Sequence, residues 1–93
     1  MDEIRREDGP AGGRLFMESG GSEAELTWRN GPEGRYLVTH TYTPPARRGQ
    51  GVALKLVEHM VEIARSEGRG IVPLCGYVAA QARNRPDWAD VMG

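Results

Sequence analysis

The chain has 93 residues, 12 basic and 13 acidic side chains with a net charge of −1, and a single cysteine. This length predicts one domain whose core is a thin layer between a sheet and one or two helices. One cysteine excludes an internal disulfide framework and a multi-cysteine zinc or iron–sulfur site, so we expect no metal site. The balanced charge gives no generic attraction to nucleic acid or to an anionic membrane.

The expected location of the protein is the cytoplasm. No apolar run approaches the ~18 residues of a membrane span, and residues 1–8 lack the apolar stretch of a secretory signal. A single unpaired cysteine also fits a reducing compartment better than a secreted protein.

Residues 1–13 differ in composition from the rest of the chain. They carry four acids, two arginines and a Gly- and Pro-rich stretch, and Ile4 is the apolar anchor among them. We expect these residues to form either a flexible arm or a first edge strand. A single domain over residues 14–93 follows.

Three strands are predicted in the first half of that domain. Residues 14–18 and 24–29 are short runs on either side of a Ser- and Gly-rich turn, and the second run alternates strictly. A second turn at residues 30–34 leads into residues 35–43, which are rich in β-branched and aromatic side chains. Two consecutive prolines then end the third strand, because they cannot donate ladder hydrogen bonds.

The second half predicts a helix and a fourth strand. Apolar residues recur at spacings of three and four between Gly51 and Gly68, and Gly68 can end this helix in a left-handed cap. Residues 70–75 then predict a short buried strand, parallel to the third strand by a right-handed crossover. Pro73 in this strand marks a place where pairing should stop. Residues 77–83 predict a short final helix.

These elements define an α/β (α+β) fold class. The expected architecture is a mixed antiparallel and parallel sheet, packed on one long central helix with a short C-terminal helix.

The loop before the long helix has the chemistry of a phosphate site. It consists of Arg47, Arg48, Gly49, Gln50, Gly51, Val52 and Ala53. Alternating glycines let backbone N–H groups turn inward, the helix start adds unpaired N–H donors, and two arginines add charge. The alternative is a glycine loop with solvated arginines, and spacing alone does not decide between them. The loop is not a P-loop, and Leu54 occupies the third glycine position of the dinucleotide fingerprint.

Four sequence blocks stand out in chain order: residues 40–44 (HTYTP), 48–53 (RGQGVA), 71–78 (IVPLCGYV) and 84–88 (NRPDW). Together these blocks resemble the GNAT N-acetyltransferases, and in particular their small YjdJ-type subgroup. The resemblance covers roughly residues 14 to 92. The resemblance implies a minimal GNAT fold and transfer of an acetyl group from acetyl-CoA to an amine. The acceptor is an unidentified small molecule or protein.

The resemblance also implies a cofactor site. The loop from Arg47 to Ala53 would hold the pyrophosphate of acetyl-CoA, and Asn84 matches a position where a polar side chain meets the cofactor. Thr41, Tyr42 and Thr43 match the strand that splays from its parallel neighbour and offers a backbone N–H to the thioester oxygen. The missing N–H of Pro73 on the facing strand agrees with such a splay.

His40 and Cys75 are the candidate catalytic residues. Histidine accepts a proton near neutral pH, which suits a base for the attacking amine, although a strand histidine can also be a hydrogen-bonded structural residue. A Cys75 thiolate could take the acetyl group before passing it on, although a small buried apolar role is the alternative. If the two faced each other across the splayed strands, each could activate the other.

Two departures from the family keep a second function open. Ala46 stands where the superfamily loop usually has Gln or Arg, and the chain lacks the elements that normally shape the acceptor pocket. An open acceptor site, or one completed by a second subunit in a homodimer, would follow. The alternative function is an acetyl-CoA or CoA sensor or interaction module with little catalysis. A nucleic-acid binder is disfavoured by the acidic N-terminus and the lack of an aromatic array.

Overall fold

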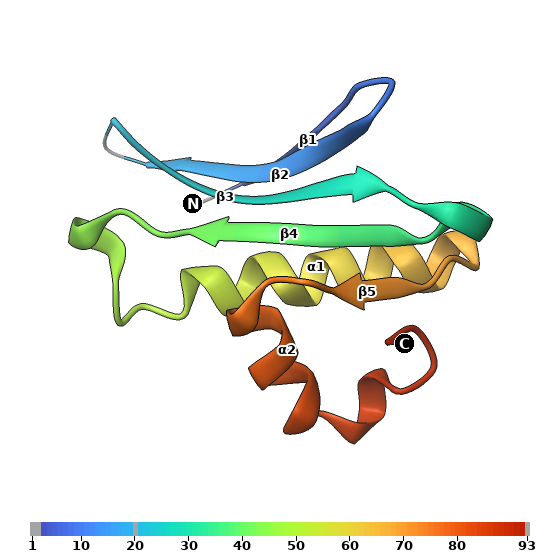
Figure 1. Cartoon of the computed structure of the whole chain (residues 1–93). Helices are drawn as coiled ribbons and strands as arrows, with labels where there is room; N and C mark the ends of the chain where they lie inside the picture. Colours follow the sequence, from blue (N-terminus) through green and yellow to red (C-terminus); the bar gives the residue numbers. More distant parts are fainter. Residues whose placement is uncertain (1–2, 20, 93) are drawn as a thin grey trace.

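The computed structural model describes residues 3–19 and 21–92, and they form a five-stranded sheet in the order β1-β2-β3-β4-β5 with two α-helices packed against it (Figure 1). The strands are β1 (Ile4–Asp8), β2 (Gly12–Ser19), β3 (Ser22–Asn30), β4 (Tyr36–Tyr42) and β5 (Ile71–Pro73). The helices are α1 (Val52–Glu67) and α2 (Gly76–Arg83), with single 3-10 turns η1 (Pro32–Gly34), η2 (Pro45–Arg47) and η3 (Pro86–Trp88).

The sheet has the mixed topology predicted from the sequence. Strands β1 to β4 form an antiparallel meander, and β5 runs parallel to β4 after the crossover through α1. The predicted fold class is therefore confirmed. Pairing of β4 with β5 ends at Val38 and Pro73, as the missing N–H of the proline requires.

Strand β1 lies at the outer edge of the sheet, in register with β2 from Ile4 opposite Met17 to Asp8 opposite Gly13. The Arg6 side chain crosses the Trp28 ring at 5.6 Å and donates a 3.1 Å hydrogen bond to Glu67 at the end of α1. Residues 4–8 are thus joined both to the sheet and to the long helix.

The core lies between the sheet and the helices. Leu15, Leu26 and Tyr36 from the strands are fully buried against Leu56 of α1, and Val78 of α2 joins the same cluster. Each such aliphatic side chain contributes about 1.5–3 kcal/mol by leaving water. In the part of the chain that the structure describes, neither α-helix has the length and apolarity to cross a membrane.

A β-bulge interrupts the pairing of β3 with β4. Thr27 lies opposite His40 and Trp28 lies opposite Val38, so Thr39 is an extra residue on β4. Paired residues on antiparallel strands point to the same face, and one extra residue reverses the alternation that follows it. Tyr36 and Val38 are therefore buried on the core face before the bulge. After it, Thr41 takes that face opposite buried Leu26.

Helix α1 is bounded by two glycines in the left-handed region. Gly51 at its N-cap has φ 72° and Gly68 at its C-cap has φ 67°. Gly68 N–H bonds back to the last turn of the helix, which is the C-cap predicted from the sequence. The chain therefore leaves α1 sharply and returns along β5 beside β4 (Figure 1).

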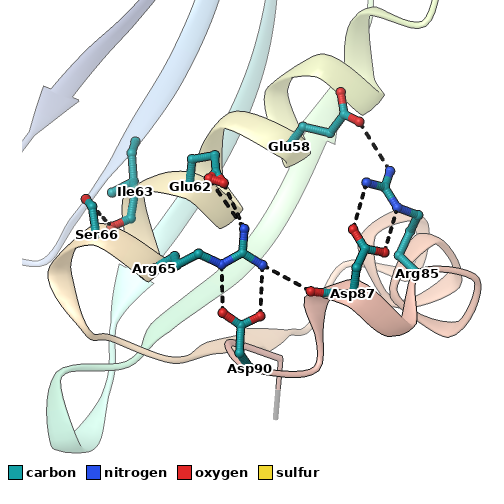
Figure 2. Close-up of polar contacts among 8 residues, drawn as sticks. All are labelled: Glu58, Glu62, Ile63, Arg65, Ser66, Arg85, Asp87 and Asp90. Carbon is teal, nitrogen blue, oxygen red and sulfur yellow. Dashed lines mark hydrogen bonds and ion pairs between the residues drawn. The ribbon is translucent and has the colours of Figure 1, made fainter.

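The C-terminal segment returns to α1. Trp88 of η3 is 3% exposed, and ion pairs join Arg85 to Glu58 and Arg65 to Asp90 across the two segments (Figure 2). These contacts hold the C-terminal segment against α1.

Candidate functional site

The loop between β4 and α1 borders a pocket of about 310 Å³. Its lining residues are Thr43, Arg47, Arg48, Gly49, Gly51, Val52, Ala53 and Tyr77. Gly49 and Gly51 have φ of 83° and 72°, a region that glycine enters without steric cost. A Cβ built at either position meets no protein atom within 4 Å, so the space beside both glycines is open to a ligand.

The pocket has the electrostatics of an anion site. Two arginines line it, and the first turn of α1 behind it holds no acidic residue. Arg48 Nε donates to the Thr43 carbonyl at 3.1 Å, and Arg47 Nε donates to Gln50 Oε1 at 3.2 Å, so both side chains are held at the loop. The N-terminus of α1 adds N–H donors and its positive dipole end. A pyrophosphate therefore fits the donors present.

Tyr77 lines the same pocket from α2. Burial raises the pKa of its hydroxyl, and the charge of Glu58 on α1 raises it further. The phenol therefore stays protonated near neutral pH and can donate a hydrogen bond into the pocket.

Strands β4 and β5 separate beyond Val38. The Val38 carbonyl accepts hydrogen bonds from both Leu74 N–H (2.9 Å) and Cys75 N–H (3.0 Å), and the chain then turns into α2. Within the described residues, the ladder of β5 ends there while β4 runs on to Tyr42. On the edge where β5 pairs with its first half, the second half of β4 thus faces the start of α2.

Cys75 stands at this turn, as the N-cap residue of α2. Its Sγ lies 3.6 Å from Thr41 Oγ1, a hydrogen-bonding distance for the large sulfur atom. Burial acts to raise the pKa of the thiol, but the Val78 N–H, the Thr41 hydroxyl and the N–H groups of Tyr77 and Thr41 outweigh it. The net pKa of Cys75 is below its ordinary value, which favours the reactive thiolate.

His40 and Tyr42 lie on the other face of β4. His40 is exposed and in register with Thr27, and Tyr42 is 43% exposed and in register with Glu25. The bulge therefore brings Thr41 to Cys75 and turns His40 to the open face. The structure does not pair the two candidate catalytic residues on one face.

Some of the remaining predicted residues line the pocket and others do not. Most of the loop lines the pocket, whereas Gln50 instead holds Arg47 and donates to the Ala46 carbonyl. Asn84 lies at the far end of α2, where its Nδ2 donates to the Ala80 carbonyl at 3.4 Å. Asn84 is therefore not one of the residues that line this pocket.

Sequence reasoning assigned two members of this site incompletely. It did not place Tyr77 at the phosphate pocket, although its position two residues after Cys75, in the first turn of α2, was a usable signal. It gave Thr41 only a backbone role. The reason is the bulge, which forms at Thr39 without the glycine that often marks one.

Comparison with known proteins agrees with this geometry. Residues 14–91 match the family described as GCN5-related N-acetyl-transferase. The fold is similar to the solution structure of a GCN5-like candidate N-acetyltransferase from Staphylococcus aureus, with a TM-score of 0.70 and 21% sequence identity. That similarity covers 100% of this chain and 91% of the other.

The chain belongs to the GCN5-related N-acetyltransferase family and is an acetyltransferase of the GNAT type. The family resemblance predicted from the sequence is thereby confirmed. The narrower YjdJ-type subgroup stays a prediction.

Proposed function

We propose that this protein transfers an acetyl group from acetyl-CoA to an amine. The observation that carries the proposal is the pocket at the start of α1, where Arg47 and Arg48 line the same space as two left-handed glycines, Gly49 and Gly51. Phosphates bind where arginines, glycine N–H groups and a helix N-terminus converge, and CoA carries a pyrophosphate.

In this proposal the loop from Arg47 to Ala53 holds the pyrophosphate. The acetyl end would then extend along the separated half of β4, toward the start of α2. The backbone of residues 41–43 supplies the N–H for the thioester oxygen, as the family resemblance implies. Acetyl-CoA supplies the acetyl group as an activated thioester.

Cys75 is the proposed nucleophile. Its thiolate forms a bond to the acetyl carbon while the bond from that carbon to the CoA sulfur breaks, and the CoA thiolate leaves. An acceptor amine then takes the acetyl group, which returns the Cys75 thiolate, and the proton of the amine passes through solvent to His40 on the other face of β4. The lowered pKa of Cys75 supports the first step, and the exposed position of His40 suits contact with an acceptor from solvent.

A CoA-binding module with little catalysis is the second candidate. The observation that favours it is the reversed alternation of β4, which puts the His40 imidazole and the Cys75 thiol on opposite faces of the strand.

Isothermal titration with acetyl-CoA, with CoA and ATP as controls, tests the binding part of the proposal. We expect micromolar affinity for acetyl-CoA and much weaker binding of ATP. Arg48→Ala should weaken acetyl-CoA binding about tenfold, because a charge-assisted hydrogen bond is lost. Arg29→Ala is the matched control, since Arg29 is exposed and pairs with Leu37 near the start of β4, whereas the loop follows the other end of that strand. Equal affinities for the two variants would contradict the placement of the pyrophosphate.

Turnover separates the two candidate functions. Release of free CoA from acetyl-CoA is followed with a thiol reagent in the presence of a polyamine, amino acids and a lysine peptide. Acceptor-dependent release, lost in Cys75→Ala while acetyl-CoA binding persists, is the expected result. Binding without release for any amine would favour the CoA-binding module.

A further inference from the structure

We propose that the Thr41 hydroxyl orients and activates the sulfur of Cys75, and that the Thr27–Thr39 pair is a positioning device that puts Thr41 there. This inference rests on the nucleophilic role of Cys75 in the proposed function. It assigns side-chain roles to three threonines, whereas the family resemblance implies only a backbone role for Thr41 and none for Thr27 or Thr39.

The first step of the argument is the direction of the Thr41 side chain. Without a bulge, the alternation that buries Tyr36 and Val38 would put residues 40 and 42 on the core face. The observed register instead sets Thr41 opposite buried Leu26. One extra residue on β4 is therefore the cause of the 3.6 Å contact between Thr41 Oγ1 and Cys75 Sγ.

The second step is what holds the bulge in place. The hydroxyl oxygens of Thr27 and Thr39 lie 3.1 Å apart, and Thr39 Oγ1 also donates to the Thr27 carbonyl at 3.4 Å. Thr27 is the residue on β3 at which the register shifts, and Thr39 is the extra residue on β4. The two side chains thus join the strands at the irregular position, where the normal ladder is interrupted.

The third step is the chemistry at the sulfur. A hydroxyl can donate a hydrogen bond to a thiolate, which stabilises the charged form and fixes the direction of the attacking lone pair. The dominant influences on Cys75 are burial, the Thr41 hydroxyl and the N–H groups of Thr41, Tyr77 and Val78. Titratable side chains on the neighbouring elements include Tyr77 on α2, Glu58 on α1, and His40 on the opposite face of β4. The Thr41 hydroxyl is the one side-chain donor among the named influences.

The test is the pH dependence of Cys75 alkylation by iodoacetamide. Cys75 is the only cysteine of the chain, so the reaction reports this thiol alone. We expect Thr41→Val to raise the pH midpoint of the reaction and to slow alkylation at pH 7 by about three- to tenfold. Thr41→Ser, which keeps the hydroxyl, should restore most of the rate. Ser66→Ala is the control, because the Ser66 hydroxyl donates to the Ile63 carbonyl at the far end of α1 from the thiol (Figure 2).

The positioning pair has its own variants. Thr39→Val keeps the β-branched shape but removes both hydrogen bonds, so we expect the midpoint to move in the same direction as in Thr41→Val. Thr39→Ser should restore it. Unchanged midpoints in Thr41→Val and Thr39→Val, with both proteins folded by circular dichroism, would overturn the inference.

The readout does not depend on acetyl transfer. If acetyl-CoA does not bind but the midpoints move as expected, the proposed function fails and the role of the threonines at the thiol stands. If acetyl-CoA binds and Cys75→Ala loses transfer while the midpoints stay fixed, the proposed function stands and this inference fails.

Discussion

Arg65 of α1 donates two hydrogen bonds to the carboxylate of Asp90, 2.7 Å from Nε to Oδ2 and 2.8 Å from Nη2 to Oδ1 (Figure 2). The same Nη2 also donates to the Asp87 carbonyl at 3.1 Å. One helix residue thus holds two points of the C-terminal segment, on the side where Trp88 is buried. We expect the ion pairs to orient this segment and the buried indole of Trp88 to provide most of its attachment.

The first prediction separates these two contributions. Asp90→Asn should lower the unfolding midpoint only slightly, because Arg65 and Asp90 are both exposed to water, which screens their attraction. Trp88→Ala should cost about 3–5 kcal/mol, since it removes a buried aromatic side chain. Urea unfolding at pH 7 measures both. A loss in Asp90→Asn as large as that in Trp88→Ala would mean that the ion pair, and not the indole, fastens the segment.

The second prediction concerns the Tyr36 hydroxyl, which lies in a charged cluster at the other edge of the core. It donates to Glu67 and accepts hydrogen bonds from Arg69 (2.7 Å) and Arg6 (3.2 Å). The hydrogen bond from Tyr36 lowers the pKa of Glu67, with further lowering by Arg6 and Arg69. Tyr36→Phe should cost about 1–3 kcal/mol, because the surrounding charged groups lose a buried partner.

The lowered pKa of Glu67 has a consequence for acid stability. The pKa of Glu67 in the folded protein lies below its value of ~4.3 in the unfolded chain. Glu67 therefore stabilises the fold at pH values above ~4.3, and this stabilisation is lost as the pH falls through the folded-state pKa. The contribution should be below about 1 kcal/mol, because the Glu67 side chain is about one-third exposed. In Glu67→Gln the free energy of unfolding should therefore fall less between pH 7 and pH 3 than in the parent. An identical fall in both proteins would contradict this role.

Much of the fold follows from short-range signals in the sequence. Gly68 ends α1 as a left-handed cap, and Pro73 ends the pairing of β5, because each acts through its own backbone geometry. The phosphate loop was predictable for the same reason, since its glycines and arginines are contiguous. These features depend on neighbours in the sequence and little on the rest of the fold.

The contact of Thr41 with Cys75 was not predictable in this way. It depends on the register of β3 with β4, and the bulge at Thr39 lies between two strands whose hydrophobic patterns each look regular. An alternation count along β4 alone would place His40 on the core face, where Thr41 is found one residue later. The residues of the candidate site could thus be recognised from the sequence. The face of the sheet on which each side chain lies could not, because it depends on the pairing of β3 with β4.

The third prediction tests a close approach in the sheet. A Cβ added at Gly13 would lie 2.4 Å from the Glu7 carbonyl oxygen and 2.6 Å from Cζ2 of Trp28, so the strands or the indole must shift. Gly13→Ala should therefore destabilise the protein by about 1–3 kcal/mol. Gly76→Ala is the matched control, because a Cβ there meets no atom within 4 Å at the first position of α2. It should be neutral or stabilising by up to about 1 kcal/mol.

Thermal unfolding of both alanine variants makes the comparison. Equal midpoints would mean that β1 and β2 do not pack on Trp28 as closely as the distances require.

The last prediction assigns His40 to the acceptor step alone. Its side chain is exposed on the face of β4 opposite to the Thr41–Cys75 contact. His40→Gln should therefore leave acetyl-CoA affinity and the pH profile of Cys75 alkylation unchanged. It should slow transfer to an amine by about 100-fold, the lower range for loss of a general base. His59→Gln is the control, because His59 is exposed on α1 and lines no part of the pocket. If His40→Gln transfers acetyl groups at the parent rate, solvent or the acceptor itself carries the proton. If it instead shifts the alkylation profile, His40 reaches the thiol from the open face and the two residues act together.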